Sequence, residues 1–193
     1  MNLPNRLTLS RIILTVVIII LCLFPFHTIG VEFPRFNIGG LVVDSVYLIS
    51  GIIYIIAALT DFFDGDIARK RNLVTDTGKL LDAIADKVLV NSVLVIFAVK
   101  GFIPAIVPVI YIFRDEVVNS LKMDALRKGR VVAAIKSGKL KTASMMIGLA
   151  LMFFYNLPFE LINLKVADFL IYFALIMSIV SAIEYYNLWK KLK

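Results

Sequence analysis

Long runs of apolar residues constrain the fold of this chain more than any other feature. Six such runs occur, at about residues 7–27, 42–69, 79–100, 102–121, 140–159 and 166–188. The chain is 60% hydrophobic and only 18% charged, whereas a soluble domain carries roughly a quarter charged residues. A soluble core could not bury all of these runs. The sequence therefore predicts an all-α, polytopic membrane bundle of six transmembrane helices, forming a single domain over residues 1–193.

Basic residues gather at the ends of the apolar runs and mostly on one side of the predicted bundle. They include Arg6, Arg11, several positions in 69–79 and in 114–141, and the C-terminal lysines. Because Lys and Arg are enriched in cytoplasmic loops, this asymmetry places both termini in the cytoplasm. The formal net charge of +7 is thus a topology signal, and nucleic acid is not expected as a partner.

Four aspartates stand out near the ends of the second and third runs: Asp61, Asp64, Asp82 and Asp86. Ionisable residues at membrane depth cost about 2.5–3.5 kcal/mol each on insertion scales, which makes them functional hypotheses. The first two are three residues apart and the last two are four apart, so each pair shares one helix face. The short connection makes the two helices antiparallel neighbours. Four carboxylates can then meet in one pocket, where all-oxygen ligation favours Mg²⁺ or Mn²⁺.

The residues around these aspartates fit a phosphate ligand. Gly65 and Gly78 allow a ligand to approach the backbone closely, and Arg69 provides a fixed cation. Asp66 lies about 140° around the helix from the first aspartate and is excluded from the pocket. Asp76 is placed in the connecting loop.

Two other interpretations of the aspartates stay open. They could pair only with neighbouring basic side chains and hold the bundle together. The basic side chains in question are Arg69, Lys79 and Lys87. The four aspartates could also form the relay of an ion or proton transporter. The absence of internal repeats and the positions of the glycines and the arginine argue against a transporter.

The whole pattern resembles the signature of the CDP-alcohol phosphotransferase family. The matching positions, with every gap intact, are Asp61, Asp64, Gly65, Ala68, Arg69, Gly78, Asp82 and Asp86. Members of that family have six transmembrane helices, with the signature on the second and third. The resemblance implies two Mg²⁺ or Mn²⁺ ions ligated by Asp61, Asp64, Asp82 and Asp86. It also implies CDP contacts from Asp61, Gly65, Arg69 and Gly78, and a general-base role for Asp86.

The resemblance also implies an activity. Family members that make phospholipids transfer a phosphatidyl group from CDP-diacylglycerol to an alcohol and release CMP. Two metal ions can neutralise the diphosphate and stabilise an in-line displacement, and a carboxylate can take the proton of the attacking hydroxyl. The expected setting is a homodimer in the bacterial cell (inner or plasma) membrane, multi-pass and surrounded by membrane lipids, with its active site on the cytoplasmic side.

Three short strings, at residues 1–8, 113–116 and 138–142, narrow the choice of alcohol. They resemble the bacterial phosphatidylglycerophosphate synthases of this family, which implies sn-glycerol 3-phosphate as the acceptor. Its dianionic phosphate needs a basic pocket, and the predicted ligands are Arg114, Lys139 and Lys141. The basic residues of 122–130 are assigned to attraction of anionic lipid headgroups. The same chemistry with inositol phosphate or serine as the acceptor stays open.

Overall fold

The computed structural model describes the backbone of residues 3–70, 76–130, 132–133 and 135–192, and the side chains of 8–60, 81 and 84–191 apart from 131 and 134. The described part contains six α-helices: α1 (Leu3–Leu23), α2 (Ser45–Lys70), α3 (Asp76–Val99), α4 (Ile106–Arg127), α5 (Lys136–Phe153) and α6 (Val166–Leu192). Two short antiparallel strands, β1 (Arg35–Ile38) and β2 (Leu41–Asp44), and two 3₁₀ turns, η1 (Phe26–Ile29) and η2 (Phe159–Ile162), complete it. The described part is mostly helical, as the predicted all-α class requires, and the crossing of a membrane by six helices stays a prediction.

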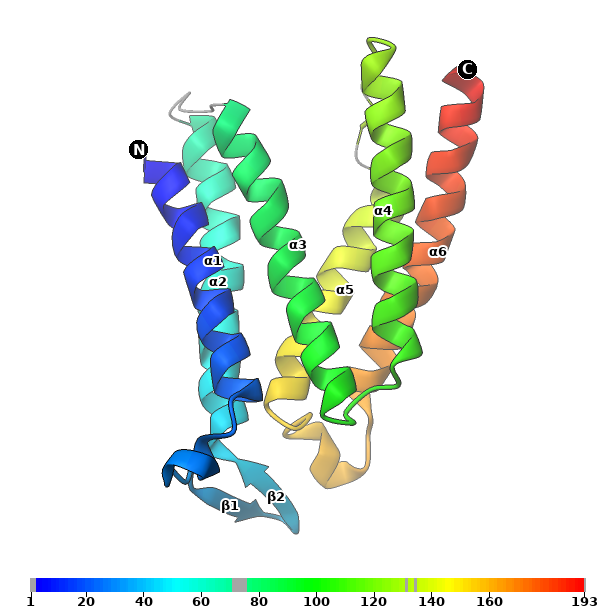
Figure 1. Ribbon diagram of the computed structural model, residues 1–193. Helices are drawn as coiled ribbons and strands as arrows, with labels where there is room; N and C mark the ends of the chain where they lie inside the picture. Colours follow the sequence, from blue (N-terminus) through cyan, green and yellow to red (C-terminus); the bar gives the residue numbers. More distant parts are fainter. Residues whose placement is uncertain (1–2, 71–75, 131, 134, 193) are drawn as a thin grey trace.

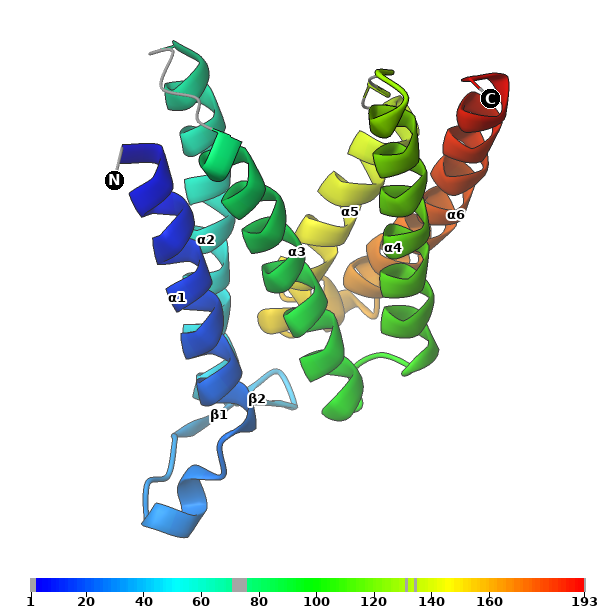
Figure 2. The same ribbon diagram turned by 45° about the horizontal axis from the view of Figure 1, so that its top comes forward.

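The helices run up and down along a common direction, in two groups. Figure 1 shows α1, α2 and α3 on one side and α4, α5 and α6 on the other, and the turned view of Figure 2 keeps this division. Helix α1 packs against α2 and α3, while α6 packs against α4 and α5. Contacts of α2 with α5, and of α3 with α4 and α5, join the two groups. The N- and C-terminal ends lie at one end of the bundle and the β-hairpin lies at the other (Figure 1).

Buried apolar side chains from all six helices form one core. Its centre is aromatic: the Phe97 and Phe153 rings lie 4.7 Å apart, and Tyr54 lies 5.5 Å from Phe153. These rings come from α3, α5 and α2. The core therefore joins the two groups of helices, away from the helix ends that carry the termini.

Two glycines let helices approach closely within this core. A Cβ atom at Gly51 of α2 would stand 2.7 Å from Cβ of Phe153, and one at Gly148 of α5 would stand 2.9 Å from Cγ1 of Ile171. Real Cβ atoms do not approach neighbours this closely, so each glycine sets the distance between two helices.

Large apolar side chains also cover the outward faces of the helices. Examples, one from each helix in order, are Ile13, Ile55, Val99, Phe113, Ile147 and Phe169. Phe113 is 70% exposed and Phe169 is 67% exposed. Among the described residues, Val166–Lys191 is long and apolar enough to cross a membrane, and the stretches Thr8–Leu23 and Ser45–Thr60 are apolar but shorter.

The β-hairpin was not predicted from the sequence. The second apolar run was expected to be helical from residue 42, but α2 begins at Ser45, because the preceding residues pair with β1 as strand β2. Gly39 and Gly40 form the turn, with φ angles of 60° and 90°. Two successive residues with positive φ are typical of the two-residue turn that joins twisted antiparallel strands.

Several helix ends also differ from the expected ones. Helix α3 begins at Asp76, which the sequence analysis placed in a loop, and α4 continues to Arg127, beyond the expected end at residue 121. Helix α5 was expected over 140–159 and spans Lys136–Phe153. Hydropathy marks the apolar part of a helix, whereas its polar turns continue as long as backbone hydrogen bonding allows.

Candidate active site

The aspartate motif falls on two helices that follow one another in the chain. The backbone positions of Asp61, Asp64, Gly65 and Arg69 belong to the last turns of α2, and those of Gly78, Asp82 and Asp86 to the first turns of α3. These helix ends lie at the same end of the bundle as the termini (Figure 1). Apart from that of Asp86, these side chains lie outside the described residues. The predicted metal and CDP contacts therefore stay predictions, and the described side chains alone contain no cluster that could hold a metal ion.

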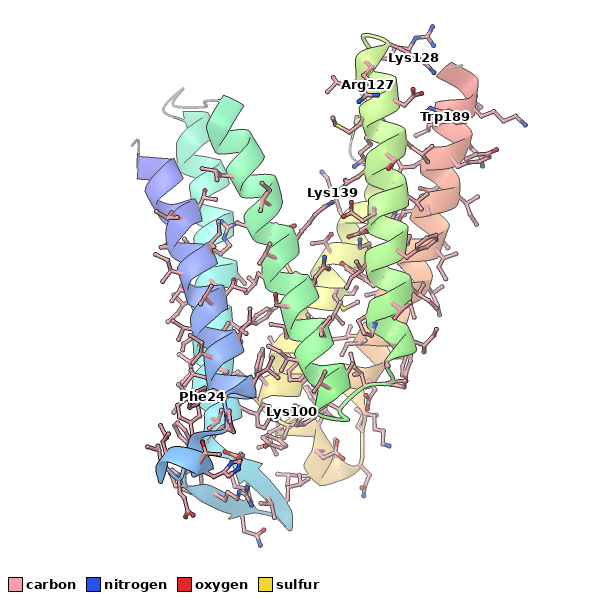
Figure 3. All side chains as sticks on the ribbon, viewed as in Figure 1. Phe24, Lys100, Arg127, Lys128, Lys139 and Trp189 are labelled. Atoms are coloured by element: carbon pink, nitrogen blue, oxygen red, sulfur yellow. The ribbon has the colours of Figure 1, made fainter. Side chains whose placement is uncertain are left out.

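Asp86 lines a cavity of about 520 Å³ between α3, α4, α5 and α6. The three residues predicted to bind the acceptor phosphate line the same cavity: Arg114 from α4, and Lys139 and Lys141 from α5. The fold thus brings together an acid of the motif and three cations that are distant from it in the sequence. Lys139 is exposed and extends from α5 toward the space beside α3 and α4 (Figure 3). The role of these residues as phosphate ligands stays a prediction.

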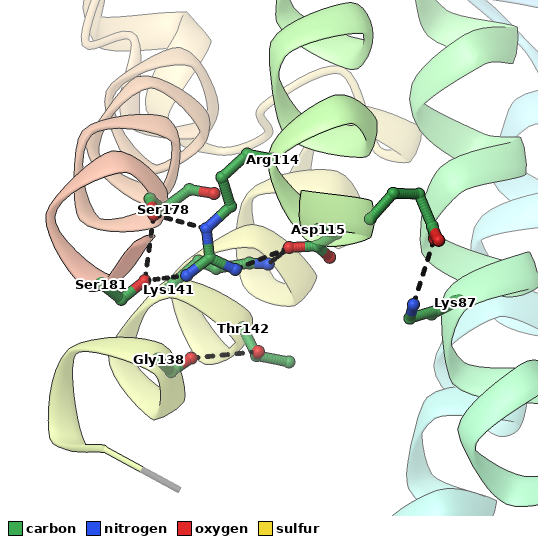
Figure 4. Close-up of polar contacts among 9 residues, drawn as sticks. Lys87, Arg114, Asp115, Gly138, Lys141, Thr142, Ser178 and Ser181 are labelled. Carbon is green, nitrogen blue, oxygen red and sulfur yellow. Dashed lines mark hydrogen bonds and ion pairs between the residues drawn. The ribbon is translucent and has the colours of Figure 1, made fainter. Parts of the chain in front are cut away.

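Two of these cations share one carboxylate (Figure 4). Arg114 donates a hydrogen bond from Nη1 to Oδ1 of Asp115 over 2.7 Å, and Lys141 donates from Nζ to the same oxygen. Arg114 also donates from Nε to the carbonyl oxygen of Ser178 over 2.6 Å and from Nη2 to the hydroxyl of Ser181. The network joins α4, α5 and α6, and charge-assisted hydrogen bonds of this kind are the strong ones.

The local sequence explains how α6 accepts a guanidinium group. Ser178 and Ser181 are both fully buried, and Ser181 donates from its hydroxyl to the Ser178 carbonyl oxygen over 3.0 Å. Small side chains at these two positions leave room for Arg114, which is only 8% exposed. Each guanidinium nitrogen donates one hydrogen bond here, and the group still carries further N–H donors.

Lys141 is held from a second direction by an aromatic ring. Its ammonium nitrogen lies 4.1 Å from the centroid of Tyr111, and the residue is only 5% exposed. The face of an aromatic ring attracts a cation. Lys141 is therefore fixed between a ring and a carboxylate, in contrast to the exposed Lys139.

Lys122 and Tyr185 are among the residues of the cavity wall that the sequence analysis did not assign to the site. Lys122 was assigned to lipid attraction, yet it lines the cavity, with its Nζ atom 4.3 Å from the ring centroid of Tyr185. Tyr185 is buried, and its hydroxyl accepts a hydrogen bond from the backbone N–H of Ile135 over 3.3 Å. The helical spacing could have predicted that Lys122 lines the cavity. Lys122 follows Arg114 by two helical turns, with Val118 between them on the same face.

The basic residues at the C-terminal end of α4 and just after it lie away from this cavity. Arg127 and Lys128 stand at the far end of the helix, near Trp189 (Figure 3). Lys128 pairs with Asp124 over 2.7 Å, and Trp189 donates a hydrogen bond from Nε1 to the same carboxylate oxygen over 2.7 Å. The hydrogen bonds from Lys128 and Trp189 lower the pKa of Asp124. This end of α4 thus contacts α6 through a second, separate polar cluster.

Lys87 is one of the side chains that could have paired with the motif aspartates. It donates a hydrogen bond to Glu116 of α4 over 3.2 Å (Figure 4). This contact links α3 to α4 at the cavity edge. Contacts of Lys87 with the side chains of Asp61, Asp64 and Asp82 lie outside the described residues.

Comparison with known proteins identifies the family. The sequence profile of the CDP-alcohol phosphatidyltransferase family matches residues 1–180. A Bacillus subtilis (strain 168) protein named CDP-diacylglycerol–glycerol-3-phosphate 3-phosphatidyltransferase is 38% identical over 193 residues, covering 100% of this chain and 97% of its own. Proteins of the same name from Rickettsia bellii (31% over 192 residues, 98% and 96% covered) and Mycoplasma genitalium (34% over 150 residues, 77% and 63% covered) are also similar. The predicted family is thus confirmed: the chain belongs to the CDP-alcohol phosphatidyltransferase family.

Proposed function

We propose that this chain transfers a phosphatidyl group from CDP-diacylglycerol to sn-glycerol 3-phosphate, giving phosphatidylglycerophosphate and CMP. The observation that carries this proposal is the cavity in which Asp86 of the motif meets Arg114, Lys139 and Lys141. An alcohol that bears a phosphate needs cations beside the group that activates its hydroxyl. The similar proteins of Bacillus subtilis and Rickettsia bellii are named for the same transfer.

The motif residues are proposed to hold the donor. Asp61, Gly65, Arg69 and Gly78 would contact the CDP part, and the four carboxylates of Asp61, Asp64, Asp82 and Asp86 would ligate two metal ions. Oxygen-only ligands of this charge fit Mg²⁺ or Mn²⁺. When bound, such ions neutralise the diphosphate and stabilise the charge that develops during an in-line displacement.

The cavity residues are proposed to hold and activate the acceptor. Arg114, Lys139 and Lys141 bind the phosphate of glycerol 3-phosphate and leave one of its two free hydroxyl groups near Asp86. Asp86 takes the proton of that hydroxyl as its oxygen forms a bond to the phosphatidyl phosphorus. The bond between this phosphorus and the CMP oxygen breaks, and CMP leaves with the bonding electrons.

The setting is proposed to be the bacterial cell membrane. The six helices would span the membrane, with the termini and the cavity on the cytoplasmic side and the β-hairpin on the other. The exposed apolar side chains on every helix and the basic residues near the termini support this orientation. A homodimer is part of the proposal and rests on the resemblance to the family.

An acceptor panel tests the proposal. The purified chain is given CDP-diacylglycerol, Mg²⁺, and either sn-glycerol 3-phosphate, inositol phosphate or serine, and the lipid product is identified by mass spectrometry. We expect phosphatidylglycerophosphate from the first acceptor and little product from the others. Predominant transfer to serine or inositol phosphate would replace the proposed acceptor.

The same assay tests the metal ions. Because four carboxylates cannot all stay charged in one pocket without cations, chelation with EDTA should abolish transfer, and Mg²⁺ or Mn²⁺ should restore it. Full activity in excess EDTA after extensive dialysis is the result that would refute the metal site.

A further inference from the structure

Asp115 makes ion pairs with two of the three residues proposed to bind the acceptor phosphate. Its Oδ1 atom accepts hydrogen bonds from Nη1 of Arg114 and from Nζ of Lys141. The Asp115 side chain is 15% exposed, and those of its two partners are 9% and 6% exposed. An acidic residue in an anion-binding cavity is unexpected, because a carboxylate repels a phosphate.

The position of Asp115 is fixed from α6. Arg114 is anchored by the Ser178 carbonyl oxygen and the Ser181 hydroxyl, and it donates a third hydrogen bond from Nη1 to Asp115. Asp115 in turn bonds Lys141 of α5. The chain of contacts therefore runs from α6 through Arg114 and Asp115 to the ammonium group of Lys141 (Figure 4).

The charges explain why a shared carboxylate is useful here. Two cations buried side by side repel each other, and burial penalises each of them. One carboxylate oxygen bonded to both offsets these penalties. A single negative charge does not cancel two positive ones, so the cluster keeps a net positive charge toward the cavity that also contains Lys139.

We propose that Asp115 is a positioning residue of the acceptor site: it holds the Lys141 ammonium group in the cavity wall, where Lys141 binds the acceptor phosphate. Asp115 does not touch the acceptor and acts through Lys141. The inference rests on the proposed function and adds to it a residue that selects for acceptors with a phosphate group.

A double-mutant cycle tests this role. Asp115→Asn removes the charge that holds Lys141, so it should raise the KM for glycerol 3-phosphate about tenfold, with the donor KM unchanged and kcat little altered. In a Lys141→Met background the same substitution should raise the acceptor KM no further, because the residue through which it acts is gone. Asp115→Glu, which keeps the carboxylate, should recover part of the loss.

Glu116→Gln is the matched control, since Glu116 is the next acid of α4 and pairs with Lys87 outside this network. It should leave the acceptor KM unchanged. If Asp115→Asn does not give a monodisperse protein, the cycle is run with Asp115→Glu, for which about a threefold rise is expected. An unchanged acceptor KM, or an equal rise in both backgrounds, would overturn the role of Asp115. A wild-type chain that transfers nothing to glycerol 3-phosphate would instead refute the proposed function.

Discussion

At the scale of single residues, the acids near the end of α2 differ in helical phase rather than in chemistry. Asp61 and Asp64 are three residues apart and share a face, whereas Asp66 is turned by about 140° from Asp61. All of them belong to the same helix. Neutralising one at a time therefore separates the effect of position from the effect of charge.

We predict that Asp61→Asn, Asp64→Asn and Asp82→Asn each lower turnover by orders of magnitude, because each removes a charged ligand of the proposed metal ions. Asp66→Asn should keep most of the activity and serves as the matched control. Initial rates of CMP release at saturating substrate concentrations give the turnover of the four variants. Equal damage from Asp66→Asn and Asp64→Asn would show that the assignment of the helix face is wrong.

The exposed cation of the cavity allows a second test. Lys139→Gln should raise the KM for glycerol 3-phosphate by roughly tenfold to a hundredfold, because a charge-assisted contact to phosphate typically contributes about 1.5–3 kcal/mol. The donor KM should change little. Arg127→Gln is the control, since Arg127 lies at the far end of α4, away from the cavity (Figure 3). A similar rise in both variants would mean that the acceptor site is elsewhere.

At the scale of elements, the packing of α2 against α5 depends on Gly51, which has no side chain. A Cβ at Gly51 would stand 2.7 Å from Cβ of Phe153 and 3.1 Å from the Phe154 ring. Because Cβ of Phe153 is tied to the backbone, the helices themselves would have to move apart. Gly138 of α5 offers a contrast, since the nearest atom to a Cβ there is 3.6 Å away.

We predict that Gly51→Ala lowers the free energy of unfolding by about 1–3 kcal/mol, the usual cost of overpacking, less the gain of helix propensity of up to about 1 kcal/mol. Gly138→Ala should be neutral or stabilising, because it gains the propensity without the clash. Thermal unfolding in detergent, followed by circular dichroism, compares the two. A midpoint for Gly51→Ala at or above that of the wild type would contradict the close approach of α2 and α5.

The helices were predictable from the sequence, and the connections between them were not. The apolar runs predicted all six helices, because the side chains of each run must be buried or face lipid, and a helix satisfies its own backbone hydrogen bonds there. The β-hairpin was hidden, since Leu41, Val42 and Val43 extend the apolar run of α2 without any change in composition. Only the two adjacent glycines before them, at 39 and 40, indicated a turn.

The candidate site was predictable only in part, because the sequence shows which residues are charged but not which of them meet in space. Charge and motif spacing singled out Asp86, Arg114, Lys139 and Lys141, which the fold brings to one cavity. The contribution of Asp115 could not be read from the sequence. It depends on α5 and α6 meeting α4 at one point, and tertiary contacts of this kind leave no local pattern.

At the scale of the whole molecule, the termini and the β-hairpin lie at opposite ends of the bundle (Figure 1). The chain has a single cysteine, Cys22, which is buried and donates a hydrogen bond to the hydroxyl of Ser50. Cys22→Ser thus gives a background in which one introduced cysteine reports one position.

We predict that a membrane-impermeant maleimide labels Asn37→Cys, in β1, on intact bacterial cells, and labels Lys191→Cys, in α6, only after the cells are opened. The reason is the positive-inside rule, which holds the basic end in the cytoplasm. Mass-tag gel shifts measure the labelled fraction, and a denatured sample gives the maximum. Labelling of Lys191→Cys on intact cells would invert the proposed topology.

The exposed apolar side chains on the helices affect how the KM values for donor and acceptor are to be measured and compared. A chain held in lipid by these faces meets its donor within a two-dimensional layer, while a water-soluble acceptor arrives from three dimensions. The quantity that governs donor binding is then the mole fraction of donor in the layer, not its molarity. Added detergent dilutes the donor at constant bulk concentration. Donor KM values of two variants are therefore comparable only at one fixed ratio of lipid to detergent, whereas acceptor KM values keep their ordinary units.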